Sequence, residues 1–373
     1  MTDPFLFPDP LPWDAVARPL AAAEDALARV DERLRSSPIR EGWIARTHFS
    51  DAAAALWIEG ELVHLEDLVL HDAVMDVRAP THELTRAHAI LRTRRRIAGA
   101  APDWALSSAG LDALRGRSGV EATSPFDCED IEPGRDEEED FEPAIEADEG
   151  LAELIAAVDS ASLRVDRTLA GDGPPAPSAS RERDPLAYDL DWDEDACLAE
   201  WRAIVDRTRE LPPTLAAALA HDAWNAIEPL QRAPGLGGLL AAALLRERGK
   251  TRAHLPCLAE GAKAVPRERR RSRDATTRLI AALKAVATGA QEGLKQHDRW
   301  LLARELLLRK LDGRRSTSKL PELIEFALSR PLISAGMIAK ALGVTPRAAQ
   351  NHVAEQDLRE ATGRGRYRAW GIL

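Results

Sequence analysis

Three polar side chains near the C-terminus of the sequence recur at the spacing of one helical face. Arg347, Gln350 and Asn351 follow Thr345 and a proline, and residues three and four positions apart lie side by side on a helix. A guanidinium group pairs with guanine, and a carboxamide pairs with adenine, at the base edges that the major groove of a duplex exposes. The pattern therefore predicts a helix that reads DNA bases, with Thr345 at its N-terminal end.

A second set of polar side chains, Arg364, Arg366 and Arg368, alternates close to the end of the chain. Alternate residues of a strand project to one face. Thr362-Gly-Arg-Gly-Arg lies between two stretches that contain apolar residues, which predicts a β-hairpin with glycine at its turn. We expect these arginines to contact phosphates or the minor groove, and so to supply affinity rather than sequence preference.

The elements that must carry both sets form one module over residues 319–373. Apolar spacing predicts helices at 320–329, 335–342 and 345–356, the last with Thr345 as N-cap and Pro346 at its first position. Gly343 permits the tight turn before the third helix because glycine enters positive φ at little cost. Together with the hairpin, this order predicts a winged helix-turn-helix. The alternative is a module that only packs against another domain or dimerises.

The rest of the sequence is also predicted to be helical, so the fold class is all-α with one small β-hairpin. Helical apolar periodicity at 14–30, 50–58, 64–74 and 81–97 defines an N-terminal helical domain over residues 1–97. The same periodicity at 197–208, 214–227, 238–248, 274–288 and 291–311 defines a second helical domain over residues 190–318. Prolines and glycines mark the breaks between these helices.

A different composition separates the two helical domains. Carboxylates dominate from about residue 121 to 150, including Asp136-Glu-Glu-Glu-Asp140, and a stretch rich in Pro, Gly and Ser follows near residue 175. Such segments repel themselves and bury too little apolar surface to offset chain entropy. We expect residues 121–185 to be a mobile linker, with a short helix at 151–165 as an option. The acidic run lacks the residue spacing of a calcium-binding loop.

The charge balance restricts how the protein can meet a nucleic acid. The chain has 373 residues with 50 Lys and Arg against 61 Asp and Glu, a formal net charge of −11. Bulk charge therefore does not attract a polyanion, and any such contact must be local. Residues 263–315 carry an excess of basic residues, including five arginines within 267–273. We expect a basic surface next to the C-terminal module.

The sequence has no stretch of about 20 unbroken apolar residues, and its N-terminus lacks the features of a secretory signal. We therefore expect a cytoplasmic protein that does not cross a membrane. Cys128, Cys197 and Cys257 lie far apart and are odd in number, which fits neither a disulfide framework nor a zinc site. Reduced, unliganded thiols are the expectation.

Several candidate enzyme and metal sites in the sequence are disfavoured by geometry or by missing residues. His64 and His71 would lie roughly 10 Å apart on a helix, too far for one metal ion. His221 and Asp222 are adjacent and point in different directions on a helix. Phosphate-binding loops and nucleophile elbows with the required residues are missing from the sequence. We predict no cofactor and no metal.

Residues 52–68 carry a resemblance to a known family. Ile58-Glu59-Gly60 and Leu65-Glu66-Asp67-Leu68 are similar to the Ser-x-x-x-Glu-Gly helix and the following Leu-Glu-Asp-Leu of Fic-domain proteins, although Ala55 replaces the serine. Fic-domain proteins commonly end in a winged helix. The resemblance implies a Fic-like helical body in which Glu59 restrains nucleotide binding. A glycine that simply ends a helix after an exposed glutamate explains the same residues.

The catalytic loop of that family, His-Pro-Phe-x-Asp-Gly-Asn-Gly-Arg-x-x-Arg, is similar in position to residues 226–240 here. The resemblance places other residues where the family has its general base, metal-binding acid, phosphate-wrapping amides and arginine clamp: Glu228, Arg232, Ala233 with Pro234, and Leu236 with Leu239. Nucleotidyl transfer needs base, metal and clamp together. The resemblance therefore implies a body without catalytic residues.

The whole chain, including residues 360–373, also resembles a family of uncharacterised helix-turn-helix proteins carried on plasmids and genomic islands of soil bacteria. The combined prediction is a non-enzymatic, sequence-specific protein that binds double-stranded DNA and regulates transcription. A homodimer is expected because one winged helix reads only a short site. The alternative from another class is an adaptor that uses the winged helix for packing. A nucleotidyl transferase with altered residues is the remote alternative.

Overall fold

The structure is a computed structural model that describes residues 8, 10–74, 79–116, 192–231, 233, 235–311, 319–361 and 368–372. Apart from Trp192, all of these belong to one unit formed by Met1–Gly119 and Asp193–Leu373. The predicted linker at 121–185, the optional helix at 151–165 and Cys128 lie outside the described residues.

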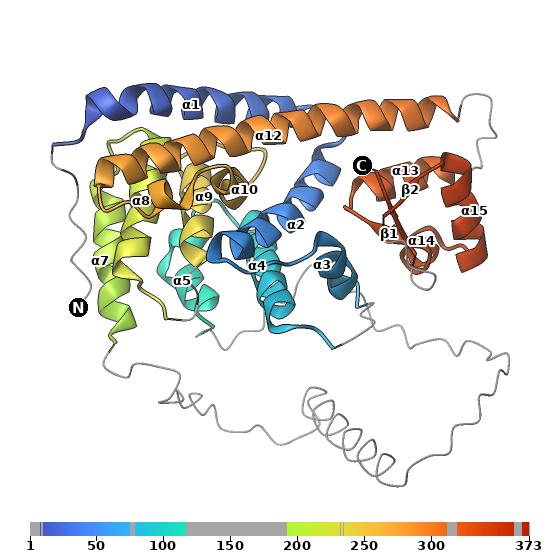
Figure 1. Ribbon diagram of the computed structural model, residues 1–373, viewed down its shortest axis with the longest axis horizontal. Helices are drawn as coiled ribbons and strands as arrows, with labels where there is room; N and C mark the ends of the chain where they lie inside the picture. The colour runs from blue at the N-terminus through green and yellow to red at the C-terminus, as the bar shows by residue number, and fades with distance from the viewer. Residues whose placement is uncertain are drawn as a thin grey trace, which may run out of the picture. The chain divides into compact units, whose positions relative to one another are not determined.

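The first half of the body consists of helices connected by short turns (Figure 1). Thr81 accepts a hydrogen bond from the backbone N–H of Leu84 at 3.2 Å and so caps one helix, as its N-terminal position predicts. The second helix begins at Arg40, ten residues before the predicted start, because its first half buries polar side chains that hide the apolar pattern. The elements are α1 (Trp13–Arg35), α2 (Arg40–Glu59), α3 (Leu65–Asp72), α4 (His82–Gly99), η1 (Trp104–Leu106) and α5 (Ser108–Leu114).

The second half of the body ends in one long helix, where two helices were predicted. The predicted break falls at Gly289, which lies inside a continuous helix of 35 residues. A side chain at Gly289 would come within 2.6 Å of the carbonyl oxygen of Cys257, so this glycine serves close packing and not a turn. The elements are α7 (Glu194–Arg207), α8 (Pro213–Ile227), α9 (Leu236–Glu247), α10 (Leu258–Lys263), α11 (Arg267–Arg270) and α12 (Ala275–Arg309).

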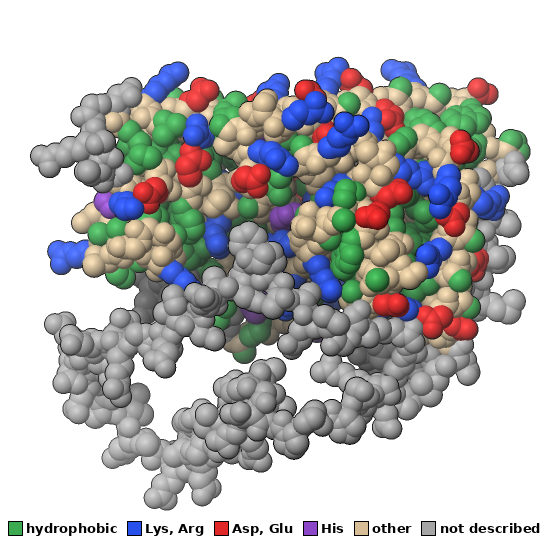
Figure 2. Space-filling model, turned by 180° about the vertical axis from the view of Figure 1, so that it is seen from behind, with side chains coloured by type: hydrophobic (Ala, Val, Ile, Leu, Met, Phe, Trp, Pro, Cys, Tyr) green, Lys and Arg blue, Asp and Glu red, His purple; other side chains and the backbone are tan. Residues whose placement is uncertain are grey.

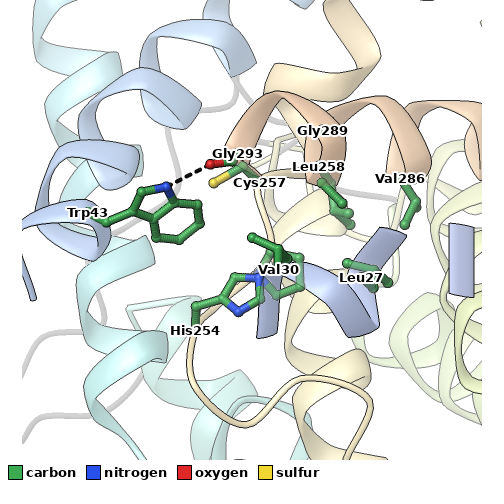
Figure 3. A pocket seen from close by; sticks show the side chains of 11 residues that line it. Leu27, Val30, Trp43, His254, Cys257, Leu258, Val286, Gly289 and Gly293 are labelled. Atoms are coloured by element: carbon green, nitrogen blue, oxygen red, sulfur yellow. Dashed lines mark hydrogen bonds between the residues drawn. The ribbon is translucent and has the colours of Figure 1, made fainter. Parts of the chain in front are cut away.

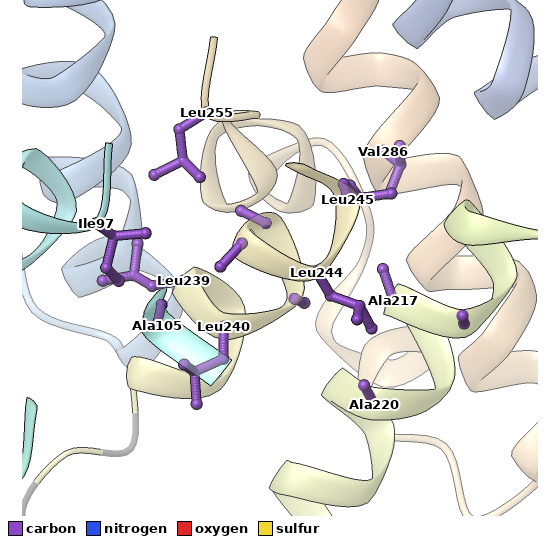
Figure 4. Packing of buried hydrophobic residues seen from close by; sticks show 14 of the residues in the cluster. Ile97, Ala105, Ala217, Ala220, Leu239, Leu240, Leu244, Leu245, Leu255 and Val286 are labelled. Carbon is purple, nitrogen blue, oxygen red and sulfur yellow. The ribbon is translucent and has the colours of Figure 1, made fainter. Parts of the chain in front are cut away.

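One hydrophobic core contains side chains from both halves of the body. Helix α9 contributes fully buried leucines such as Leu240 and Leu245, α8 packs against it, and Val286 of α12 belongs to the same cluster (Figure 4). Ile97 from α4 belongs to the same cluster, as do residues of α1. Residues 1–97 and 190–318 are therefore joined by a common core.

A buried ion pair fixes α2 and α4 to the segment that precedes α10. Arg94, which is 1% exposed, donates to Asp51 at 2.7 Å and to the carbonyl oxygens of Leu255 and Pro256 at 2.8 and 3.1 Å. Burial raises the pKa of Asp51 even though Arg94 opposes that shift. The guanidinium thus satisfies backbone carbonyls that would otherwise be buried without a donor.

The C-terminal module has the predicted order of helices, so the all-α class with a small sheet is confirmed. It contains α13 (Leu320–Leu328), α14 (Ala335–Leu342) and α15 (Pro346–Gln356). Strands β2 (Arg359–Glu360) and β3 (Ala369–Gly371) form the predicted hairpin. A third strand, β1 (Ile333–Ser334), was not predicted because two residues show no alternation; it pairs antiparallel with β3 and gives the order β1-β3-β2.

The winged helix is attached to the body through the buried guanidinium of Arg46 in α2. Arg46 is 5% exposed. Its guanidinium donates to the carbonyl oxygens of Ala327, Pro331 and Ile372 at 3.4, 3.3 and 3.0 Å. It also lies over the ring of Trp300 in α12, 4.6 Å from the centroid. Burial and the nearby Arg299 lower the pKa of Arg46 to about 10, so it stays charged at neutral pH.

Apolar contacts surround this polar attachment. Leu332 and Met337 of the module share a buried cluster with Phe49 and Leu68 of the body, and Leu307 of α12 joins the core of the module. Buried surface of this kind contributes roughly 25 cal/mol per Å² of apolar area. The module is therefore packed on the body and not merely connected to it.

We expect Arg46→Ala to destabilise the chain by about 3 kcal/mol or more, because buried carbonyls lose their donor. The control is Arg29→Ala, since Arg29 forms an exposed i,i+4 ion pair with Asp25; this change should stay within about 0.5 kcal/mol. Urea unfolding curves of both variants measure the free energies. Equal costs for the two substitutions would contradict the role of Arg46.

Candidate nucleic-acid interface

The turn between α14 and α15 has the geometry that the sequence predicts. Gly343 lies in the left-handed region at φ 66°, and its N–H and that of Val344 both bond to the carbonyl of Ala339. Thr345 then caps α15, because its hydroxyl accepts a hydrogen bond from the N–H of Ala348 at 3.2 Å. Ser334 caps α14 in the same way, accepting from Met337. Local signals therefore determine where both helices start.

The apolar side of α15 fixes which residues it presents to solvent. Ala349 and Val353, 0% and 2% exposed, face the core of the module. Arg347, Gln350 and Asn351 lie on the opposite side and are exposed. Within the described ranges, no hydrogen bond or ion pair occupies these three side chains. They form what we call the α15 stripe, and their donors and acceptors are available to a ligand.

The wing is only partly described. Arg368 is exposed at the start of the return strand and donates through Nε to Glu360 at 2.9 Å. Its guanidinium lies 5.4 Å from the ring centroid of Trp370, and the bond to Glu360 raises the pKa of Arg368. The charge expected to contact phosphate is therefore shared with a carboxylate of the same hairpin. Arg364 and Arg366 lie outside the described residues.

The basic run at 267–273 does not lie next to the C-terminal module, contrary to the expectation from sequence. It directly precedes α12, whereas the module contacts the other end of that helix through Lys310, which donates to the carbonyl of Gln356 at 3.0 Å. At 1.5 Å per residue, 35 residues separate the two ends by roughly 50 Å. Proximity in sequence was misleading because one uninterrupted helix intervenes.

The loop equated with a catalytic loop by resemblance leads into the hydrophobic core. Leu236 and Leu239 are 5% and 6% exposed and pack in the main cluster. Glu228 ends α8 in the left-handed conformation at φ 49°. Glu59 forms an ion pair with Arg86, so its carboxylate already has a partner. Arg232 and Pro234 lie outside the described residues.

A small pocket lies between α1, α2, α12 and residues 254–258 (Figure 3). The indole N–H of Trp43 donates to the carbonyl of Gly293 at 3.0 Å, and His254 bonds to Asp31 at 3.0 Å. Burial raises the pKa of Cys257 to about 12, which keeps it a thiol. The remaining lining is mostly apolar, so we interpret the pocket as part of the core.

The described residues were also compared with the requirements of metal binding and of a membrane span, and they meet neither. Among these residues, no group of three or more His, Cys, Asp and Glu side chains is placed to hold a metal ion. No helix among them is long and apolar enough to cross a bilayer. Figure 2 shows that acidic and basic side chains are interspersed over one face of the molecule, as expected for a chain without bulk attraction to polyanions.

The buried position of Arg46 was not predicted, although the sequence contains a signal for it. Trp43, Arg46 and Phe49 recur at three-residue spacing, which places a cation in the apolar stripe of a helix. A charged residue at such a position predicts buried acceptors nearby. Which acceptors it meets depends on tertiary contacts with residues 281 to 326 positions away in sequence.

Two parts of the chain match known protein families. Residues 320–373 match a family described as an HTH DNA binding domain, and residues 186–312 match DUF1612, a protein of unknown function. The chain thus carries a helix-turn-helix DNA-binding domain on a helical body.

The chain belongs to the family of y4cF, an uncharacterized protein of Sinorhizobium fredii (strain NBRC 101917 / NGR234). The two are 49% identical over 369 residues, which covers 96% of this chain and 97% of y4cF. A crystal structure of a Fic family protein from Desulfovibrio desulfuricans G20 aligns over 99% of this chain and 98% of that one, with 17% identity and a TM-score of 0.44. The family membership rests on the identity and coverage shared with y4cF.

The α15 stripe generates a prediction about sequence preference. Gln350→Ala or Asn351→Ala should weaken binding to a preferred duplex, selected from a random pool, by about 1–3 kcal/mol, because each removes a pair with a base edge. Binding to random-sequence DNA should hardly change. Gln291→Ala is the control, since Gln291 is an exposed glutamine of α12. Fluorescence anisotropy measures both affinities, and equal losses on the two DNAs would contradict base reading.

Proposed function

We propose that the protein is a sequence-specific double-stranded-DNA-binding regulator of transcription. The observation that carries this proposal is the α15 stripe: Arg347, Gln350 and Asn351 are exposed, unoccupied by other described residues and located on the third helix of a matched DNA-binding domain. Side chains of these types recognise guanine and adenine in the major groove. Thr345, at the N-cap, is placed to contact a phosphate beside them.

The attachment of the module supports the same function, because it leaves α15 available. The contacts with the body use α13, the segment 331–334, Met337 of α14 and residues 369–372, including the carbonyls that Arg46 bonds. Helix α15 contributes only the carbonyl of Gln356 at its C-terminal end, which accepts from Lys310. Ala349 and Val353 take the inner side of α15. A duplex can therefore approach the stripe without displacing the body. The wing residues Arg364, Arg366 and Arg368 are proposed to add phosphate or minor-groove contacts.

The body is proposed to be catalytically inactive. Leu236 and Leu239, which stand where the Fic resemblance requires an arginine clamp, are buried in the core and carry no charge. Glu228 would place a carboxylate where that resemblance requires a base that accepts a proton beside a phosphate. A body without these groups is suited to holding the winged helix and to forming contacts with other chains.

A homodimer is part of the proposal. A single recognition helix contacts only a few base pairs, whereas two related by a twofold axis double the site and raise specificity. The packing of the module on the body supports a fixed separation between two such helices. Sedimentation of the full chain with and without DNA measures the oligomeric state.

An adaptor function is favoured by one observation, the extensive packing of the winged helix on the body through Leu332 and Met337. Under the adaptor hypothesis, the winged helix would serve only to pack against the body. It gives no role to the three exposed polar side chains of α15, which the DNA-binding proposal uses. We therefore prefer DNA binding.

The proposal predicts salt-dependent DNA binding in spite of the net charge of −11. Cations on α15 and the wing should release counterions from the duplex, so affinity should fall about tenfold or more between ~50 and ~200 mM salt. Anisotropy titrations at several salt concentrations provide the slope. Absence of any affinity at ~50 mM salt would contradict the proposal.

The inactive body predicts no transfer of AMP. Incubation of the full chain with labelled ATP, Mg²⁺ and a bacterial lysate should leave all proteins unlabelled, because base and anion clamp are replaced. Gel autoradiography detects transfer. Label that appears with the natural chain and disappears with Glu228→Ala would show an active site at this loop.

A further inference from the structure

An exposed basic surface lies far from the winged helix and has no role in the function proposed so far. Residues 267–273 contain five arginines and Glu268, a local charge of 5 − 1 = +4. Arg267, Arg269, Arg271 and Arg273 are exposed, and none forms an ion pair with a described residue. We call these four side chains the arginine face.

The backbone that carries the arginine face is anchored. Arg278, in the first turns of α12, donates to the carbonyl oxygens of Ser272 and Arg273 at 2.9 and 3.0 Å. The same guanidinium donates through Nε to Asp222 of α8 at 2.6 Å, a bond that raises the pKa of Arg278. Arg270 turns inward and donates to the carbonyl of Val265 at 3.0 Å. Four outward cations are therefore held close together on fixed backbone.

Unlike Arg33 and Arg304, the four arginines of the arginine face have no ion-pair partner among the described residues. Arg33 pairs with Asp298, and Arg304 pairs with Glu325, both at 2.6 Å. Asp274, the nearest carboxylate in sequence after the run, is engaged by the N–H and hydroxyl of Thr277 as a helix cap. Clustered guanidinium groups that outnumber the one carboxylate of the run, Glu268, fit a ligand with several closely spaced anions, because each fork can bind phosphate oxygens in pairs.

The arginine face is separate from the α15 interface, because the two lie at opposite ends of α12. The module packs on the C-terminal end of α12, where Arg304 binds Glu325 and Lys310 binds the carbonyl of Gln356. The arginine face precedes the N-terminal end of the same helix, roughly 50 Å away at 1.5 Å per residue. The α15 stripe points away from the core that it shares with α12. The α15 stripe and the arginine face therefore lie at opposite ends of α12.

We propose that the arginine face binds the phosphate backbone of a second segment of duplex DNA, so that one chain bridges two segments. The inference rests on the proposed function for the first segment, which α15 holds. Contacts at the arginine face are to phosphates and carry no sequence preference. They make the second contact strongly dependent on salt.

The test is a bridging assay with the full chain. A random-sequence 40-base-pair duplex is fixed on beads at ~50 mM salt, the protein is added, and capture of a fluorescent free duplex of the same length is measured. R269A/R271A/R273A removes three charges from the arginine face. R92A/R202A/R252A removes three exposed arginines elsewhere and is the matched control. Retention of protein on the beads is recorded separately from capture.

Bridging by the natural chain and the control, with at least about tenfold less capture by R269A/R271A/R273A at unchanged protein retention, is the expected result. Capture that survives in R269A/R271A/R273A would overturn the inference and assign bridging to a second winged helix in a dimer. Retention without any capture by the natural chain would also overturn it, leaving DNA binding by α15 intact. Failure of the natural chain to stay on the beads would instead contradict the proposed function. Circular dichroism confirms that the variants fold.

Discussion

The guanidinium of Arg46 is the interaction on which the arrangement of the chain depends. It donates to three carbonyls of the winged helix from within a body helix and stacks on Trp300 of α12. Because burial of an unpaired cation or carbonyl is costly, neither partner is stable in this position without the other. The body and the module are consequently held in one orientation, with the apolar side of α15 inward and its polar side free.

This constraint explains how a chain with an excess of acidic residues can bind DNA. Net charge does not attract the duplex, so recognition must come from a few side chains placed where a groove can reach them. The helix-turn-helix supplies those positions, and packing on the body leaves the α15 stripe exposed. In the same way, anchoring by Arg278 keeps arginines exposed at the opposite end of α12. Both surfaces are local exceptions to the overall charge.

Features determined by neighbouring residues could be predicted from the sequence, whereas features determined by distant contacts could not. Thr345 and Gly343 specify the start of α15 and the turn before it through local hydrogen bonds and positive φ, so that prediction is confirmed. Gly289 was misinterpreted because the reason for a glycine there is the approach of the Cys257 backbone. The basic run at 267–273 lies far from the C-terminal module because α12 is one continuous helix, which the sequence did not indicate. The base contacts of Gln350 and Asn351 remain predictions, because they depend on a partner outside the chain.

The central claim, that α15 reads bases from the major groove, is tested most directly by methylation interference. Duplexes that the protein selects from a random pool are treated with dimethyl sulfate, bound by the full chain, and compared with the unbound fraction. If α15 reads bases, duplexes methylated on guanine N7, which lies in the major groove, are depleted from the bound fraction when the methyl group is at defined positions of the site. Interference confined to adenine N3 in the minor groove, or to no position at all, would contradict it.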